Sequence, residues 1–311
     1  MTIFAVFSDI HANLPALLAA SHDARQIVKQ ENLGKVIFIS LGDVVDYGPN
    51  PSSCLRWVNR YVHYKVRGNH DEYIAAADFT LPLTLAAKYR PITVWTRTQL
   101  SQARRQQMRM WPLTMIPAEL PQFTLMHGSP ESTTARIDKE SIADAFSQLS
   151  TPFGLFGHTH HQGYFVGDGK QWLACEQNTL ESNLRNPQFV SVNQWRPIPA
   201  GRKVLFNPGS IGQPRRNLRV QMSQRMGTGP DVRAAYLLLD PSHHRFQFRR
   251  VAYDVQKTVT ALKQLKWDAS QVDLSETAPL PDLQFVLENN ETLLPQLIKQ
   301  TLIPTLTGLS H

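Results

Sequence analysis

Six short apolar runs in this sequence each end in a cluster of polar residues, and this recurring pattern constrains the fold more than any other feature. The runs are rich in β-branched and aromatic residues, so each is predicted to be a β-strand. They are Ile3 to Phe7, Lys35 to Ser40, Tyr64 to Val66, Phe123 to Met126, Phe153 to Phe156 and Lys203 to Phe206. The segments that end them read SDIH, LGD, RGNHD, HGS, GHTH and NPGS. Because strand ends in an open α/β sheet converge on one edge, these segments predict a single functional crevice.

Helices are predicted between these strands. Asn13 and Pro15 are typical of a helix start, and the predicted helix runs from Leu14 to Gln30. Further helices are predicted at Ser52 to Tyr61 and at Ile137 to Leu149. Strands that alternate with helices in this way indicate an α/β fold.

Other parts of the chain depart from this alternation. Glu72 to Met110 lacks a strand pattern and is predicted as a helical excursion over one side of the core, interrupted at Pro82 and Pro91. Residues 213–230 are polar and Arg-rich, which is typical of a loop. The segments RAAYLLLD and RFQFRRVAYD flank a polar turn and predict an antiparallel hairpin, and one or two helices are expected from about Val255.

Composition narrows the classes of function. The formal net charge of +7 and the pI of about 9.5 would suit a polyanionic partner, but the basic residues are scattered, so nucleic acid is a less favoured partner. Cys54 and Cys175 are the only cysteines and lie far apart, which argues against a disulfide framework or a thiolate metal site. No stretch approaches the roughly 18 apolar residues of a membrane span, and no basic leader precedes Ile3, so a cytoplasmic protein is expected.

Two pairs of residues have a spacing that suits metal ligands. Asp9 and His11 lie two positions apart, as do His158 and His160. In extended backbone, residues at this spacing point to the same face, so each pair could reach one site. His161 would then point away, and it is given no ligand role.

Further ligand-type residues end other strands, namely Asp43, Asn69 and His127. If one carboxylate bridges, the whole set makes about eight metal–ligand bonds, about four to each of two ions, which leaves positions for water and substrate. Mixed oxygen and nitrogen ligation suits Mn, Fe, Zn, Co or Ni better than Ca or a thiolate-loving metal.

In their order along the chain, these segments resemble a known family. The series DIH, GD, GNHD, H and GHTH, from Asp9 to His160, is similar to the motif blocks of the calcineurin-like metallophosphoesterases. GDVVDYGPNPSSC and NPGSIGQPR resemble blocks of the bacterial phosphodiesterase-like branch of that superfamily. The resemblance implies a four-layer αββα sandwich of two stacked mixed sheets. We expect the metallophosphoesterase domain to cover residues 1–254, with a helical insertion at 72–115, and a helical C-terminal appendage to follow at 255–311.

The resemblance also implies roles for individual residues. A hydroxide or water between two ions would attack phosphorus, with His70 as general acid or stabiliser of the leaving group. On physical grounds, without the resemblance, Asp46 or Asp71 is expected to orient His70, as carboxylates commonly do for active histidines. The first ion would be held by Asp9, His11, Asp43 and His160, and the second by Asp43, Asn69, His127 and His158, so that Asp43 bridges.

One block departs from the protein phosphatase branch of the superfamily. There it reads GDxVDRG, in which the Arg grips phosphate, whereas this chain has Tyr47 at that position. Arg67 and Arg215 are the candidate phosphate contacts instead, together with Asn69 and His70.

The sequence therefore predicts a hydrolase that uses two divalent ions, Mn or Fe first, to cleave phosphodiesters or small nucleotide-type phosphate esters. The alternatives are a Ser/Thr-type phosphoprotein phosphatase and a non-catalytic metal-binding scaffold of the same fold. Retention of His70 and of every ligand position argues against the scaffold, which has no need of a general acid.

Overall fold

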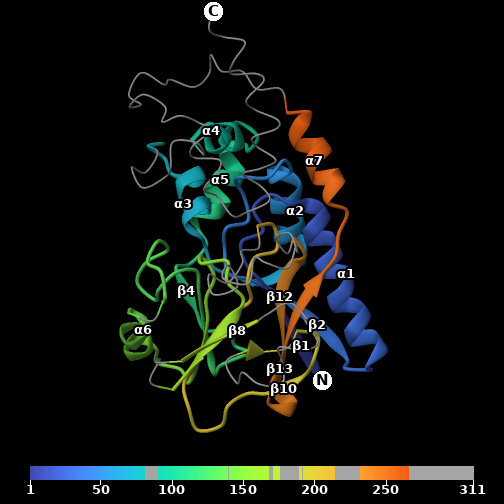
Figure 1. The fold of residues 1–311 in the computed structure, drawn as a ribbon. Helices are drawn as coiled ribbons and strands as arrows, with labels where there is room; N and C mark the ends of the chain where they lie inside the picture. The colour runs from blue at the N-terminus through green and yellow to red at the C-terminus, as the bar shows by residue number, and fades with distance from the viewer. Residues whose placement is uncertain are drawn as a thin grey trace, which may run out of the picture.

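Two mixed β-sheets stack face to face in the computed structural model (Figure 1), which describes residues 1–80, 90–138, 140–167, 171–175, 189–190, 192–213 and 232–265. Among these residues one sheet has six strands in the order β10-β13-β12-β1-β2-β3, and the other has seven in the order β4-β5-β6-β11-β7-β8-β9. The first sheet contains β1 (Thr2–Phe7), β2 (Lys35–Ser40), β3 (Val62–Lys65), β10 (Arg196–Pro197), β12 (Ala234–Asp240) and β13 (Arg245–Val251). The second contains β4 (Thr114–Met115), β5 (Phe123–Met126), β6 (Phe153–Leu155), β7 (Gly163–Val166), β8 (Gln171–Cys175), β9 (Phe189–Val190) and β11 (Val204–Asn207).

Helices cover the outer faces of both sheets. α1 (Leu14–Gln30) and α2 (Pro51–Tyr61) pack on the six-stranded sheet, and α6 (Ile142–Gln148) packs on the seven-stranded one. Beyond one end of the strands lie α3 (Asn69–Ala75), α4 (Arg90–Thr98) and α5 (Gln102–Arg109), while α7 (Val255–Lys263) lies beside α1 (Figure 1). A short 3₁₀ helix, η3 (Pro241–His243), joins β12 to β13.

The alternation of side chains along β1 explains the layering. Phe4 and Val6 pack between the two sheets, whereas Ile3, Ala5 and Phe7 pack towards α1 and α2. Neighbouring residues of a strand point to opposite faces, and β1 is buried on both. The four-layer αββα sandwich implied by the sequence resemblance is therefore confirmed.

All six predicted strands are present, with small shifts at their ends, but they divide equally between the two sheets. β1, β2 and β3 pair in parallel in one sheet, and β5, β6 and β11 do so in the other. The converging strand ends belong to two stacked sheets, so the rule for strand ends in an open sheet applies here to a pair of sheets. The predicted hairpin is confirmed as antiparallel β12 and β13.

The predicted start of one helix needs correction. α6 begins at Ile142 rather than Ile137, because the Asp138 carboxylate accepts the backbone N–H groups of Glu140 and Ser141 and holds a local turn there. Pro91 is the second residue of α4, where the first turn of a helix tolerates proline, and the residues directly before Arg90 lie outside the described part of the chain. Pro82 and the predicted loop beyond Gln213 lie outside the described residues.

Helix α7, with which the predicted appendage begins, packs against the main body. Its Thr258 Oγ1 donates to Asn13 Oδ1 over 2.9 Å, and the same oxygen accepts the N–H of Ala16 at the start of α1. Val259 and Leu262 join Tyr47 in a small apolar cluster. The domain boundary at 254 stays a prediction, and residues 266–311 lie outside the described part of the chain.

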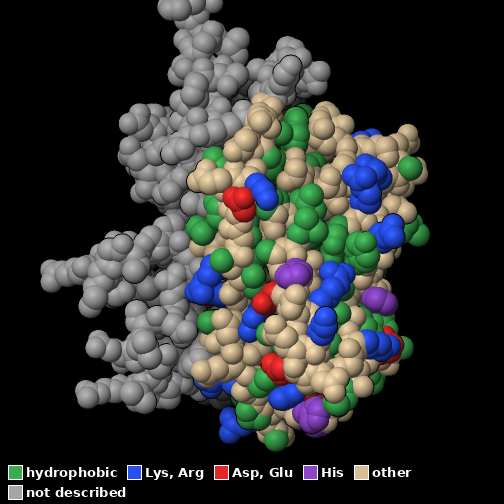
Figure 2. All heavy atoms as spheres, turned by 90° about the vertical axis from the view of Figure 1, so that its right-hand side faces the viewer, with side chains coloured by type: hydrophobic (Ala, Val, Ile, Leu, Met, Phe, Trp, Pro, Cys, Tyr) green, Lys and Arg blue, Asp and Glu red, His purple; other side chains and the backbone are tan. Residues whose placement is uncertain are grey.

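The surface agrees with the scattered charge of the sequence. On the face seen in Figure 2, Lys and Arg side chains are dispersed among apolar, acidic and neutral ones. In the described part of the chain, no helix is both long and apolar enough to cross a membrane.

Candidate metal centre and active site

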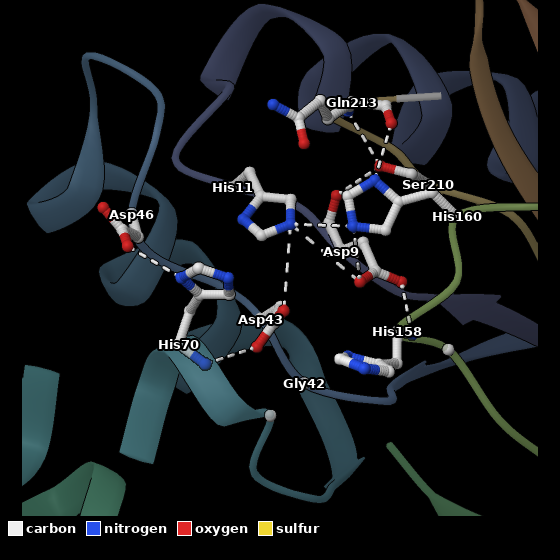
Figure 3. A network of polar contacts seen from close by, with 12 residues as sticks. Asp9, His11, Gly42, Asp43, Asp46, His70, His158, His160, Ser210 and Gln213 are labelled. Atoms are coloured by element: carbon white, nitrogen blue, oxygen red, sulfur yellow. Dashed lines mark hydrogen bonds and ion pairs between the residues drawn. The ribbon is translucent and has the colours of Figure 1, made fainter. Parts of the chain in front are cut away.

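Side chains from both sheets converge beyond the strand ends (Figure 3). They form two groups, within each of which the candidate ligand atoms lie within 4.8 Å of one another. Each residue lies within five positions of the end of β1, β2, β5 or β6, in the segment that follows the strand. The first group is Asp9, His11 and His160, and the second is Asp43, His127 and His158.

Asp43 and Asn69 connect these groups into one centre. Asp43 Oδ2 lies 3.8 Å from His11 Nε2 in the first group and 3.2 Å from His127 Nε2 in its own. Asn69 Oδ1, at the start of α3, lies 3.1 Å from His127 Nε2 and 2.9 Å from His158 Nδ1. The structure thus brings together every residue predicted as a ligand, and Asp43 faces both groups.

The backbone that presents these ligands is not extended. Asp9, His11, Asp43, His158 and His160 have φ values of 51°, 43°, 53°, 64° and 60°, in the left-handed region. The expectation that residues two positions apart share a face of extended backbone is therefore wrong, although the side chains that it selected do converge. It also fails to separate His158 from His160, which lie in different groups. Left-handed non-glycine residues cost about 1–3 kcal/mol each and cluster at functional sites.

Two motif glycines allow the ligand loops to approach closely. A Cβ on Gly68, in GNH, would lie 2.1 Å from Asp43 Oδ1, and one on Gly157, in GHTH, would lie 2.0 Å from Ser8 Oγ. No side chain fits in either place. The loops after β2 and β3, and those after β1 and β6, can therefore touch only because glycine is present.

The nitrogen and oxygen atoms of the second group are arranged as a cation would require. His127 Nδ1 lies 2.7 Å from the Leu41 carbonyl and donates to it, so in the neutral ring the Nε2 lone pair faces the oxygens of Asp43 and Asn69. The lone pairs of His127 Nε2, Asp43 Oδ2 and Asn69 Oδ1 therefore point towards one another. They repel one another unless a proton or a metal ion lies among them.

The first group repeats this pattern. His160 Nδ1 lies 2.7 Å from the Gln213 carbonyl, which leaves Nε2 facing Asp9 Oδ1 and His11 Nε2, each at 3.2 Å. Asp9 Oδ1 is buried and makes no hydrogen bond to any described residue. Both groups therefore have the burial, the lone pairs and the negative charge that a divalent ion requires.

The ionisation of these residues reflects their mutual charges. Burial alone would raise the pKa of Asp43, but the imidazoles of His127 and His70 hold it well below its ordinary value. Burial alone would lower the pKa of His127, yet the carboxylates of Asp43 and Asp9 raise it to about 9. Burial lowers the pKa of His158 to about 3, so its ring is neutral and its lone pair is free for a metal. A bound cation would take over the charge balance that a proton on His127 provides.

His70 lies beside the two groups with its ring fixed by Asp46. His70 Nδ1 is 2.7 Å from Asp46 Oδ2, and its other ring nitrogen faces the interior of the cluster (Figure 3). Both residues are buried. Burial lowers the pKa of His70, but the charge of Asp43 and the hydrogen bond to Asp46 outweigh this and raise it.

Of the two carboxylates predicted as partners of His70, Asp46 makes the contact. Asp71 instead accepts the backbone N–H groups of Val44, Val45 and Gly68 and thereby joins the loops after β2 and β3. Burial and the charge of Asp43 raise the pKa of Asp71 to about 7.

The NPGS segment supports the loop that carries His158 and His160. Asn207 Nδ2 donates to the Gly157 carbonyl and to Thr159 Oγ1, and Ser210 Oγ donates to the Asp9 carbonyl. Ser210 Oγ also accepts the N–H of Gln213, whose carbonyl accepts from His160. This segment therefore has the structural role that its Pro-Gly turn suggests, and it sets the tautomer of one candidate ligand.

The two arginines predicted to contact phosphate are not seen at the candidate metal centre in the described residues. The Arg67 guanidinium donates to the Trp111 carbonyl over 3.1 Å and lies 3.6 Å from Glu72, so its described partners belong to the protein itself. Arg215 lies outside the described residues. The Tyr47 ring packs against His70 and His11, with centroid distances of 4.4 and 4.7 Å. The contacts of Arg67 and Arg215 with phosphate stay predictions.

One residue of the site gave no signal in the sequence. Thr93, on α4, donates to Asp46 Oδ2 over 2.8 Å, although 47 positions separate the two residues. The carbonyls of Leu41 and Gln213 were likewise not foreseen as partners of ligand histidines. A backbone carbonyl has no sequence signature, and an isolated threonine in a predicted helix is unremarkable, so only the fold identifies these partners.

The chain belongs to the calcineurin-like phosphoesterase family, whose model matches residues 3–223. Hydrolysis of phosphate esters is the general activity of that family. The chain is 26% identical over 260 residues to the uncharacterized protein MJ0912 of Methanocaldococcus jannaschii. The aligned region covers 82% of this chain and 90% of that protein.

Two crystal structures share the fold. A metallophosphoesterase from Sphaerobacter thermophilus is 26% identical to this chain and superposes with a TM-score of 0.64. The superposition covers 87% of this chain and 96% of that one. The hypothetical protein PH1004 of Pyrococcus horikoshii is 18% identical, with a TM-score of 0.60, and covers 88% of this chain and 97% of its own. The second similarity speaks for the fold alone.

Proposed function

We propose that this protein is a dimetal-dependent phosphoesterase that hydrolyses phosphodiesters or small nucleotide-type phosphate esters. The observation that carries the proposal is the pair of ligand groups that face the shared carboxylate of Asp43, with the buried His70–Asp46 pair beside them.

The proposed ligand assignment follows the two groups. Asp9, His11 and His160 would hold one ion, His127, His158 and Asn69 the other, and Asp43 would contact both. When bound, two divalent ions would offset the negative charge of the phosphate and lower the pKa of a water molecule. Mn or Fe suits these nitrogen and oxygen donors best, and Zn, Ni and Co also match them.

His70 is assigned the proton transfer to the leaving group. The bond from phosphorus to the leaving oxygen breaks as a bond from phosphorus to a water oxygen forms. The leaving oxygen takes the proton of His70 Nε2, and the proton released by the water returns to His70 through solvent. Asp46 holds the Nδ1 proton, so Nε2 is the nitrogen that faces the site (Figure 3). Asn69 and His70 are also the proposed contacts to phosphoryl oxygens.

Tyr47 favours diesters and small esters over phosphoproteins. Its ring occupies the position where the protein phosphatase motif has a phosphate-gripping arginine, and it packs on His70 and His11 instead. A bidentate donor for a dianionic phosphate group is therefore missing from this block.

The test is hydrolysis of bis-p-nitrophenyl phosphate beside p-nitrophenyl phosphate and a phosphothreonine peptide. The protein is stripped with chelator and then supplied with Mn²⁺, and its metal content is assayed in the same sample. We expect metal-restored turnover that is highest on the diester. Preference for the phosphopeptide would support the phosphatase alternative, and two bound ions without turnover on any ester would support a scaffold.

A further inference from the structure

Thr93 contacts the same carboxylate oxygen that holds His70. Its Oγ1 lies 2.8 Å from Asp46 Oδ2, and His70 Nδ1 lies 2.7 Å from that atom. The other oxygen, Oδ1, accepts the backbone N–H of Tyr47 over 2.8 Å. Asp46 and Thr93 are wholly buried, so no bulk water competes for these contacts.

These three hydrogen bonds fix the rotation of the carboxylate. The Tyr47 N–H holds one oxygen, but it leaves the plane of the group free to turn about the Cβ–Cγ bond of Asp46. The Thr93 hydroxyl approaches Oδ2 from a different element and restricts that turn. Because the imidazole of His70 is bonded to Oδ2, its orientation follows the orientation of the carboxylate.

Helix α4, which carries Thr93, is itself firmly held. Arg97 Nη1 donates to the carbonyls of Ile74 and Ala76 at the end of α3, the helix that begins with Asn69 and His70. On its other side, Ile92 and Trp95 pack with Tyr47 and with Leu262 of α7. The hydroxyl is therefore presented to Asp46 by a helix that is anchored to the elements around the site.

We infer that Thr93 is a positioning residue for leaving-group protonation, which acts through Asp46 to keep Nε2 of His70 aimed at the leaving oxygen. The inference rests on the proposed function, in which His70 donates that proton. Thr93 itself touches neither the substrate nor the candidate ligands in this assignment, and it takes up and releases no proton.

The test compares Thr93→Val with Thr93→Ser and with Thr96→Val. Valine preserves the shape of threonine but cannot donate, whereas serine keeps the donor. Thr96 is the matched control, because it is also wholly buried on α4 and its hydroxyl bonds no described residue. Each Mn²⁺-loaded variant is assayed on aryl phosphate diesters whose leaving phenols range from p-nitrophenol to unsubstituted phenol.

We expect Thr93→Val to lose about 10–100-fold in kcat on the phenol ester but no more than about threefold on the p-nitrophenol ester, which needs little protonation. Thr93→Ser should recover most of the loss, and Thr96→Val should match the unaltered protein. An equal loss on both esters, or no loss on either, would overturn the inference.

A second readout separates this inference from the proposed function. In ¹⁵N-histidine-labelled protein, the proton between His70 and Asp46 should give a downfield resonance that Thr93→Val weakens or shifts and Thr93→Ser retains. If the unaltered protein hydrolyses no ester, the proposed function fails, while an unchanged resonance in Thr93→Val would overturn the role of Thr93.

Discussion

The candidate metal centre and the His70 side of the site are adjacent, but they are built in different ways. Apart from Asn69, the candidate ligands stand on loops that follow parallel strands of two packed sheets, and their neighbours are further strand-end loops. Asp46 comes from the same kind of loop and His70 from the first turn of α3, yet their geometry is completed by Thr93 on α4, a helix outside the sheets. The candidate metal centre is therefore built mainly by strand-end loops of the two sheets, while the contacts around His70 also involve a helix outside the sheets.

If this contrast is right, damage to the ligand loops should remove metal and activity together. Asp43→Asn keeps the size of the side chain and an oxygen for the His70 N–H, but it removes the charge that faces both groups. We expect less than two ions per chain by elemental analysis and a loss of about 10³-fold or more in turnover, since metal ions supply several kcal/mol of transition-state stabilisation. Asp144→Asn, at an exposed position on α6, is the control. Full metal content in Asp43→Asn would remove Asp43 from the ligand set.

On the His70 side of the site, substitution of His70 should lower the turnover number while the metal content per chain is unchanged. His70→Asn should retain two ions and lose about 10²–10⁴-fold in kcat, which is the usual contribution of general acid–base catalysis. Steady-state kinetics on diphenyl phosphate, whose unsubstituted phenol leaving group needs protonation, and metal analysis of the same sample provide the check. Unchanged turnover would show that His70 is not the acid.

Asp46→Asn sharpens the contrast within that side. Asparagine has one acceptor oxygen, so it cannot serve both the His70 and Thr93 protons on one side and the Tyr47 N–H on the other, and we expect a loss of about 10–100-fold with full metal content. Because Asp46 acts through His70, the same change should cost little in a His70→Asn background. Additive losses in this double-mutant cycle would mean that the two residues act separately.

The smallest effect on activity should come from α7, which reaches the His70 side of the site only through its packing on α4 and Tyr47. Leu262, on α7, is 2% exposed and packs in the cluster that holds α4 and Tyr47. Leu262→Ala should reduce the free energy of unfolding by about 2–5 kcal/mol and turnover only several-fold, with metal content unchanged. Leu18→Ala, at a position on α1 that is 46% exposed, should change stability by less than about 0.5 kcal/mol. Loss of metal from Leu262→Ala would contradict the independence of the two regions.

The same contrast explains how much the sequence could predict. The ligands stand in short motifs that end strands, so Asp9, Asp43 and His158 could be found from local pattern and from family resemblance. The left-handed backbone of these residues could not be predicted, because several loops must pack against one another before that conformation is stabilised. Thr93 depends on where α4 docks, which no local pattern specifies.

Position next to a motif in the sequence does not fix the direction of a side chain. Arg67 directly precedes the GNHD motif, yet its guanidinium is turned to the Trp111 carbonyl and towards Glu72. The predicted start of α6 failed for a similar reason, since the Asp138 side chain competes locally with helical hydrogen bonding.

The most direct test of the metal centre is anomalous diffraction from crystals grown with Mn²⁺. We expect two peaks about 3.5–4 Å apart, one among Asp9, His11 and His160 and one among His127, His158 and Asn69, with Asp43 in contact with both. A single peak, or two peaks that Asp43 does not join, would contradict a shared dimetal centre.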